Sequence, residues 1–155
     1  MTIANRLQRY MDQAGVRYDV VAHPRSLASS RTAQAAHVPG DRLAKAVVVH
    51  HEMGYAIAVV PSTHRVELSA LQAVLDRRLG LATEAEVAEL FDDCDYGAVP
   101  PIGAAYGVPV VLDESCDAGE VYFEGGDHTS LVHVAGEAFR KLTREARRAR
   151  ISHHV

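Results

Sequence analysis

Two adjacent apolar runs constrain the fold of this chain more than any other feature of its sequence. The runs cover residues 44–50 and 55–60, and His51-Glu52-Met53-Gly54 separates them. Short runs rich in β-branched residues, joined by a loop that contains glycine, are typical of a β-hairpin. The sequence therefore predicts at least one antiparallel strand pair near the middle of the chain.

The other segments alternate irregularly between helical and extended patterns. Helical spacing, caps or both predict helices over residues 3–14, 29–36, 68–75, 83–91 and 136–142. Thr83 and Glu86, three residues apart, predict a capping box at the start of the fourth of these helices. Apolar runs bounded by turn residues predict strands over residues 16–22, 108–112, 120–123 and 129–134, and residues 61–65 are expected to form a loop. Hairpins beside crossovers indicate an α/β (α+β) fold with a mixed sheet that is curled or closed.

Length and composition indicate one reduced, cytoplasmic domain. The 155 residues are 48% hydrophobic and 23% charged, without an internal repeat or linker, so residues 1–155 are expected to form a single domain. No apolar run approaches the ~20 residues that span a bilayer, and the N-terminus lacks the apolar region of a secretory signal. Cys94 and Cys116 form no CxxC pair, which argues against a disulfide framework and a zinc ribbon.

The charge is unevenly distributed. A formal net charge of −4 argues against a generic nucleic-acid binder. Residues 140–155 nevertheless hold six cations against the single carboxylate of Glu145, which predicts a basic C-terminal tail from about residue 144. This tail either contacts a phosphate backbone or is a solvated arginine cluster. The six carboxylates of residues 84–95 are expected to form a solvated helix face.

Lys45 is the first candidate functional residue. The chain holds 14 arginines but only two lysines, and this one stands at the head of an apolar strand. Strand alternation places it on the same face as Val47 and Val49. It either extends its ammonium group to solvent at the strand end or binds a phosphate or an oxyanion in a cleft.

The second candidate is the glycine–proline loop Gly97-Ala98-Val99-Pro100-Pro101-Ile102-Gly103. Consecutive prolines fix φ and remove N–H donors, while the flanking glycines permit close approach to the backbone. Such a loop suits recognition by main-chain groups, although a sharp structural turn remains the alternative.

The third candidate is the segment Gly125-Gly126-Asp127-His128-Thr129-Ser130. It either presents His128 to a pocket or is a hairpin turn with an exposed histidine. His128 and His133 fall on opposite sides of a strand, and the other histidine pairs are adjacent in sequence, so no metal site is expected. Recognised nucleophile and nucleotide-binding motifs are also absent from the sequence.

Taken together, four segments resemble one known family. LAKAVVV, VVPSTHRVELSAL, YGAVPPIG and EGGDHTSLVHV, in this order and spacing, resemble the YbaK/ProX family of aminoacyl-tRNA deacylases. The resemblance runs from about Ala22 to Val134. It implies a mixed, barrel-like sheet surrounded by helices, and hydrolysis of mischarged tRNA in trans without a cofactor.

The resemblance also implies where the site lies. Lys45 matches the family's strand lysine, and the Gly97–Gly103 loop matches its substrate-carbonyl loop. Lys45, Gly97, Gly103 and His128 are thus the expected catalytic residues. The expected substrate-binding residues are Ala46, Ala98, Val99, Pro100, Pro101, Ile102, Gly126, Asp127 and Thr129. Ala46 departs from the asparagine that follows the lysine in branches acting on alanyl-tRNA for proline, so the substrate amino acid stays open.

The chemistry of an aminoacyl ester fits these residues. The ester is already activated, so fixed donors that polarise its carbonyl and a delivered water or 2′-hydroxyl are sufficient. The expected partner is the 3′ end of an aminoacyl-tRNA, with an aminoacyl-tRNA synthetase left open, and neither DNA nor a membrane is expected. Two alternatives remain: a non-catalytic adaptor that binds a tRNA 3′ end or a synthetase, and a small-molecule-binding domain that uses the same cleft.

Overall fold

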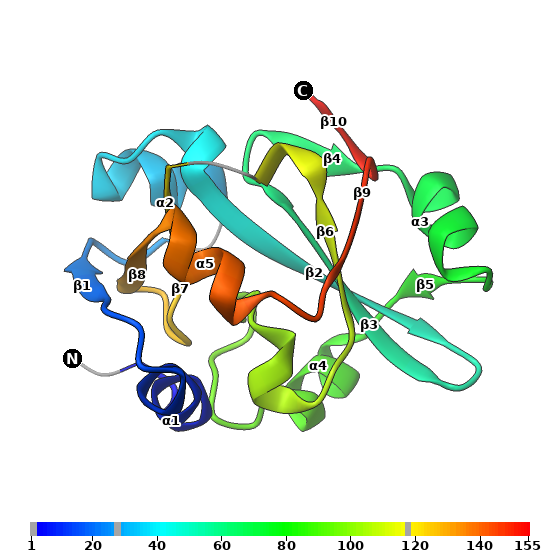
Figure 1. Ribbon diagram of the computed structural model, residues 1–155, viewed down its shortest axis with the longest axis horizontal. Helices are drawn as coiled ribbons and strands as arrows, with labels where there is room; N and C mark the ends of the chain where they lie inside the picture. The colour runs from blue at the N-terminus through cyan, green and yellow to red at the C-terminus, as the bar shows by residue number, and fades with distance from the viewer. Residues whose placement is uncertain (1–2, 27–28, 117–118) are drawn as a thin grey trace.

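The computed structural model describes residues 3–26, 29–116 and 119–155 (Figure 1). The α-helices are α1 (Asn5–Ala14), α2 (Ser29–Ala36), α3 (Leu68–Leu75), α4 (Glu84–Leu90) and α5 (Gly136–Leu142). The strands are β1 (Asp19–Ala22), β2 (Leu43–His51), β3 (Gly54–Pro61), β4 (His64–Val66), β5 (Gly80–Leu81), β6 (Val110–Asp113), β7 (Glu120–Glu124), β8 (Ser130–Ala135), β9 (Arg147–Ala149) and β10 (Ser152–His154). Short 3₁₀ helices cover Gly40–Arg42, Gly103–Tyr106 and Glu114–Cys116. No helix within the described ranges is long and apolar enough to cross a membrane.

One mixed sheet organises the fold. Its order is β1-β8-β7-β2-β3-β6-β9, with β5 paired to β2, and β10 pairs separately with β4. The β7–β2, β3–β6 and β6–β9 pairs are parallel, whereas the β1–β8, β7–β8 and β2–β3 pairs are antiparallel. The predicted mixed sheet is therefore confirmed.

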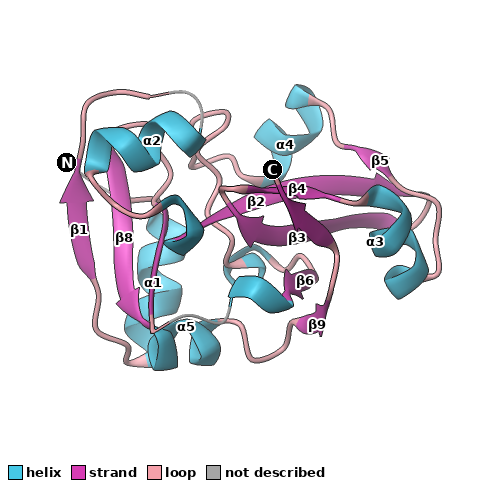
Figure 2. Ribbon diagram, turned by 90° about the horizontal axis from the view of Figure 1, so that it is seen from above, coloured by secondary structure: helices cyan, strands magenta, loops and turns pink. Residues whose placement is uncertain are grey.

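The sheet turns sharply between β7 and β2. Only two residue pairs join these strands, Leu43 with Tyr122 and Ala44 with Phe123. In Figure 2, β1 and β8 run across the direction of β2 and β3, and helices lie around both parts of the sheet. The curled sheet surrounded by helices that the sequence and the family resemblance predicted is thus confirmed.

Apolar side chains on both faces hold the helices to the sheet. On one face, Leu7 and Phe139 from α1 and α5 pack with Phe123 in the largest apolar cluster. On the other face, α2 contributes Ala33 to a small cluster with Leu43. The β1–β8–β7 part of the sheet is therefore covered by helices on both faces.

The hairpin predicted from the two apolar runs is confirmed. β2 and β3 pair antiparallel from Ala44 opposite Pro61 to His51 opposite Gly54. Gly54 closes the turn with a φ of 147°, a conformation that side chains rarely adopt. The loop predicted at residues 61–65 is shorter than expected because β3 continues through Pro61 and β4 begins at His64.

The C-terminal segment differs most from its prediction. Instead of a basic tail from about residue 144, the chain forms β9 on β6 and β10 on β4. The buried Asp113 accepts a hydrogen bond of 2.8 Å from the N–H group of Ile151, whose side chain is fully buried. A long-range polar contact and one apolar anchor thus hold this arginine-rich segment against the sheet.

Helix α4 begins with the capping box that the sequence predicts. The Thr83 hydroxyl accepts from the Glu86 N–H group at 3.2 Å, and a Glu86 carboxylate oxygen accepts from the Thr83 N–H group at 2.9 Å. We expect Thr83→Ala to lower the free energy of unfolding by about 1 kcal/mol, because it exposes an unpaired helix donor. Urea denaturation checks this value, and Thr83→Ser, which keeps the cap, is expected to retain most of the stability.

Candidate active site

Lys45 lies on β2 between two apolar clusters on the same face of the strand. Leu43 belongs to the cluster under α2, while Val47 and Val49 belong to the cluster under α3. Figure 1 shows these two helices toward opposite ends of β2. Lys45 therefore lies on β2 between the parts of the strand that these two helices cover.

The electrostatic surroundings of Lys45 suit an anion. Burial is the main cause that lowers the pKa of Lys45, and the nearby Arg65 guanidinium lowers it further. No ion pair to Lys45 occurs within the described part of the chain. A half-buried cation with a second cation nearby and no carboxylate partner favours an anionic ligand such as a phosphate or an oxyanion.

The edge of β2 opposite β3 contains a gap. In the described residues, Leu43 and Ala44 pair with β7 on this edge, and Val49 and His50 pair with β5. Positions 45–47 have no strand beside them. Strand pairing on this edge of β2 is therefore interrupted between β7 and β5.

The loop from Gly97 to Gly103 is rigid and largely buried. Gly97 is exposed, whereas Ala98, Val99, Pro100, Pro101, Ile102 and Gly103 are buried. Val99 and Ile102 belong to the same apolar cluster as Ala46, on the face of β2 opposite Lys45. The loop therefore packs against the sheet by its side chains, as the predicted main-chain recognition role requires.

Several main-chain donors of this loop have no acceptor among the described residues. The Ala98 N–H group donates to the Asp95 carbonyl at 3.1 Å. The N–H groups of Gly97, Val99, Ile102 and Gly103 donate to no group among the residues that the structure describes. Fixed, unpaired donors of this kind can stabilise a developing oxyanion.

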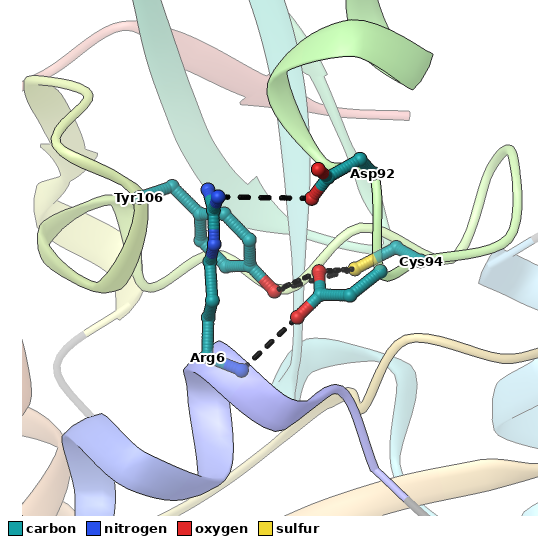
Figure 3. Close-up of polar contacts among 5 residues, drawn as sticks. Arg6, Asp92, Cys94 and Tyr106 are labelled. Atoms are coloured by element: carbon teal, nitrogen blue, oxygen red, sulfur yellow. Dashed lines mark hydrogen bonds and ion pairs between the residues drawn. The ribbon is translucent and has the colours of Figure 1, made fainter.

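A polar network closes the base of the loop (Figure 3). The Asp93 carboxylate accepts from the Tyr106 hydroxyl at 2.7 Å and from the Arg6 N–H group at 3.0 Å. The Arg6 guanidinium lies 3.9 Å from the Asp92 carboxylate and 5.7 Å from the Tyr106 ring centroid. Because Asp93 precedes the loop and Tyr106 follows it, their hydrogen bond ties both ends together and to α1.

The segment 125–130 is a tight turn organised by Asp127. One oxygen of its carboxylate accepts from the N–H group and the hydroxyl of Thr129, at 2.9 and 3.1 Å. Gly126 has a φ of 117°, and a side chain there would lie 2.9 Å from the Cβ atom of Ala4. The turn therefore requires glycine next to α1.

His128 is buried under this turn. Its Nδ1 lies 3.0 Å from the Ser26 carbonyl oxygen, and its Nε2 lies 2.6 Å from the Tyr96 carbonyl oxygen. Carbonyl oxygens only accept hydrogen bonds, so both ring nitrogens face backbone acceptors and neither is directed at an open site. The alternative that this segment is a hairpin turn with an exposed histidine is therefore wrong. The catalytic role of His128 stays a prediction, and its geometry favours positioning of the loop.

The turn and the glycine–proline loop contact each other directly. The Asp95 N–H group donates to the Gly126 carbonyl at 2.7 Å. A Cβ atom on Gly97, whose φ is 83°, would lie 3.3 Å from the Cε1 atom of His128. Two of the three predicted segments thus form one unit.

The third predicted element, Lys45, lies apart from this unit. Its face of the strand is opposite to that of Ala46 and Val99. Gly103 lines a pocket of about 530 Å³ with Arg144. Gly126 and Asp127 line a smaller one of about 250 Å³ with Asp93 and Asp95.

The sequence prediction omitted one chemically notable residue, Glu124. It is the last residue of β7 and is 6% exposed. Alternation along β7 places it on the face of Glu120 and Tyr122, a pattern typical of a solvent-facing side of a strand. Tertiary packing, which brings Thr32 of α2 close to Glu124, buries it, so no local sequence signal could reveal it.

A family model of the aminoacyl-tRNA editing domain matches residues 23–142. This range contains Lys45, the glycine–proline loop and the 125–130 turn. The chain therefore belongs to the family of aminoacyl-tRNA editing domains, also called the YbaK/ProX family. The predicted family is confirmed.

Solved structures agree with this assignment. A candidate trans-editing enzyme for prolyl-tRNA synthetase is 28% identical with a TM-score of 0.84, covering 96% of this chain and 95% of its own. A scaffold protein used for computational epitope grafting is 27% identical with a TM-score of 0.85, covering 97% of each chain. A hypothetical protein at 20% identity has a TM-score of 0.84, covers 96% of this chain and 100% of its own, and supports the fold alone. No curated protein matches the chain.

Proposed function

We propose that this protein is an aminoacyl-tRNA deacylase that acts in trans and hydrolyses the ester of a small, mischarged amino acid. The observation that carries the proposal is the editing-domain match over residues 23–142, which includes all three candidate segments. The similarity to the candidate trans-editing enzyme over nearly the full length of both chains supports action in trans. Transfer RNA for proline is one substrate that this similarity suggests.

In this proposal the protein holds and polarises the ester without forming a covalent intermediate. Burial raises the pKa of the Cys94 thiol to about 12 and that of the Cys116 thiol to about 12, so neither supplies a thiolate at neutral pH. An aminoacyl ester is activated enough for attack by a water molecule or the neighbouring 2′-hydroxyl. The remaining requirement is stabilisation of the oxyanion.

The free N–H groups of Gly97 and Val99 are suited to that task. One preorganised oxyanion donor contributes on the order of 3 kcal/mol to transition-state stabilisation. His128 keeps the loop in place through the Tyr96 carbonyl. Lys45, with Arg65 nearby, would bind the terminal phosphate or the developing negative charge and not act as a base, because its ammonium form is the one that binds anions.

Selectivity would depend on the size of the apolar surface beside the gap. Ala46, Val99 and Ile102 share one apolar cluster there. A hydrophobic site discriminates by only ~1–3 kcal/mol per methylene group, which is why synthetases need a second site that removes small wrong products. Deacylation rates on differently charged tRNAs measure which aminoacyl group fits best.

The two lysines of the chain provide a matched test. We expect Lys45→Ala to slow deacylation by about tenfold or more, because a charge-assisted contact to the substrate is lost. Rates are measured on tRNA charged with alanine, serine, threonine or cysteine. Lys141→Ala, at an exposed position of α5, is expected to leave the rates unchanged.

Two results of this panel would count against the proposal. Inactivity of the unaltered protein on every mischarged tRNA, together with tight binding of the tRNA 3′ end, would identify an adaptor. Equal loss of activity in both lysine variants would show that Lys45 has no specific role.

A further inference from the structure

Two buried polar atoms without hydrogen-bond partners lie where α2 packs near the end of β7. Among the described residues, neither the Thr32 Oγ1 atom nor the Glu124 Oε2 atom has a partner. Thr32 is fully buried on α2, and Glu124 is 6% exposed at the end of β7. The Thr32 hydroxyl lies close enough to Glu124 to lower the pKa of its carboxyl group, yet neither of the two atoms completes a hydrogen bond.

The register of the sheet places Glu124 beside Lys45. Tyr122 pairs with Leu43 and Phe123 with Ala44, after which the pairing of β7 with β2 ends. The next position on β7 is Glu124, and the next on β2 is Lys45. Both lie on the face of Leu43 and Tyr122, because side chains alternate along a strand. The two residues therefore flank the point at which the gap in β2 opens.

Leaving the buried oxygen atoms of Glu124 and Thr32 without hydrogen-bond partners costs folding free energy. Burial is the main cause that raises the pKa of Glu124 to about 8, and the Asp127 carboxylate raises it further. Buried polar groups in proteins are nearly always hydrogen-bonded, and those that are not call for a ligand, a water molecule or a functional role. A carboxyl and a hydroxyl oxygen together form an acceptor pair, which suits a group with several N–H donors.

We propose that Glu124 and Thr32 bind the protonated α-amino group of the esterified amino acid. This inference rests on the proposed deacylase function and deepens it. Lys45 and Glu124 directly follow the last paired positions of β2 and β7 on one face of the sheet, so they can serve different groups of one ligand. Lys45 would face the anionic end of the aminoacyl ester, while Glu124 faces the ammonium group.

Binding of the ammonium group is coupled to the loss of a proton from Glu124. Glu124 holds a proton in the empty protein, and an ammonium ligand favours its carboxylate form. Binding therefore releases that proton to solvent and leaves a charge-assisted hydrogen bond between the ammonium and Glu124. Esters whose α-amino group is acylated, such as peptidyl or N-acetylaminoacyl esters, cannot form this contact and would leave the acceptors unpaired.

The test compares alanyl-tRNA with N-acetylalanyl-tRNA. We expect the unaltered protein to hydrolyse the free-amine ester about tenfold or more faster, and Glu124→Gln to lose most of this preference. Thr32→Val, which keeps the shape of the side chain without the hydroxyl, is expected to reduce the preference as well. Glu120→Gln is the matched control, because Glu120 lies on the same strand and face but away from α2, and it should retain the full preference.

Binding provides a second measurement that does not depend on hydrolysis. Calorimetry with 3′-alanylamino-3′-deoxyadenosine and its N-acetyl derivative should give the same preference for the free amine. If the unaltered protein hydrolyses neither ester but binds the free-amine analogue preferentially through Glu124, the deacylase proposal fails and this inference stands. Equal binding of the two analogues, binding of neither, or an unchanged preference in folded Glu124→Gln would overturn the inference.

Discussion

Replacing Gly103 with alanine is expected to destabilise the protein by about 3 kcal/mol or to prevent folding. A Cβ atom at this position would lie 2.3 Å from the Val108 carbonyl oxygen and 2.5 Å from a methyl group of Val110. The carbonyl belongs to the backbone and cannot rotate away as a side chain does. The N–H group of Val108 also donates to the Gly103 carbonyl at 3.0 Å, so any shift would break this bond.

Alanine substitutions at two other glycines distinguish this steric effect from the effect of backbone strain. Gly107 has a φ of 68° with no atom within 4 Å of an added Cβ, so Gly107→Ala is expected to cost only about 1 kcal/mol. Gly119 has neither constraint, and Gly119→Ala is expected to change stability by less than about 0.5 kcal/mol. Guanidinium denaturation of the three variants measures these values. Equal stabilities of the Gly103 and Gly107 variants would show that the loop end relaxes freely.

Patterns that are local in the sequence predicted the fold well. The hairpin of β2 and β3 and the capping box of Thr83 both depend on residues close together in the chain. β9 and β10 were missed because nothing within residues 147–154 indicates strands. Their formation depends on distant partners, namely β6, β4 and the Asp113 carboxylate.

The candidate site was predictable in its parts but not in its arrangement. The glycine–proline loop and the turn of Gly126 and His128 were both identified, and the structure joins them. The sequence could not show that Lys45 lies on the opposite face of β2 from the loop, because that depends on which face of the sheet the loop packs against. The short ladder between β7 and β2, which leaves Lys45 without a paired strand on that edge, is likewise invisible in the sequence.

The acidic stretch of residues 84–95 shows the same limit. It was expected to form a solvated helix face, but α4 ends at Leu90 and Asp93 binds Tyr106 and the backbone of Arg6. These hydrogen bonds lower the pKa of Asp93 although burial opposes them. A carboxylate that looks solvated in sequence therefore anchors the glycine–proline loop.

Glu124 should make the protein less stable as the pH rises, the reverse of the effect of most buried carboxylates that are paired. Its pKa is raised to about 8 in the folded protein, against 4.5 for the free side chain, so the folded state binds a proton that the unfolded state releases. The free energy of unfolding must then fall as the pH rises from about 4.5 to about 8. Above this window the whole penalty of about 5 kcal/mol is present, and below it the penalty disappears.

Glu124→Gln removes this titration while keeping the shape of the side chain. We expect the variant to gain stability relative to the unaltered protein as the pH rises. Its Tm should exceed that of the unaltered protein by about 12 °C more at pH 9 than at pH 5. Scanning calorimetry at the two pH values measures the change, and effects common to both proteins cancel in the comparison. Glu114→Gln, at an exposed position that forms no ion pair within the described residues, should shift Tm by the same small amount at each pH. A difference between Glu124→Gln and the unaltered protein that does not vary with pH would mean that Glu124 ionises as easily when folded as when unfolded, and its carboxyl would then lack the buried proton that the ammonium-binding role requires it to release.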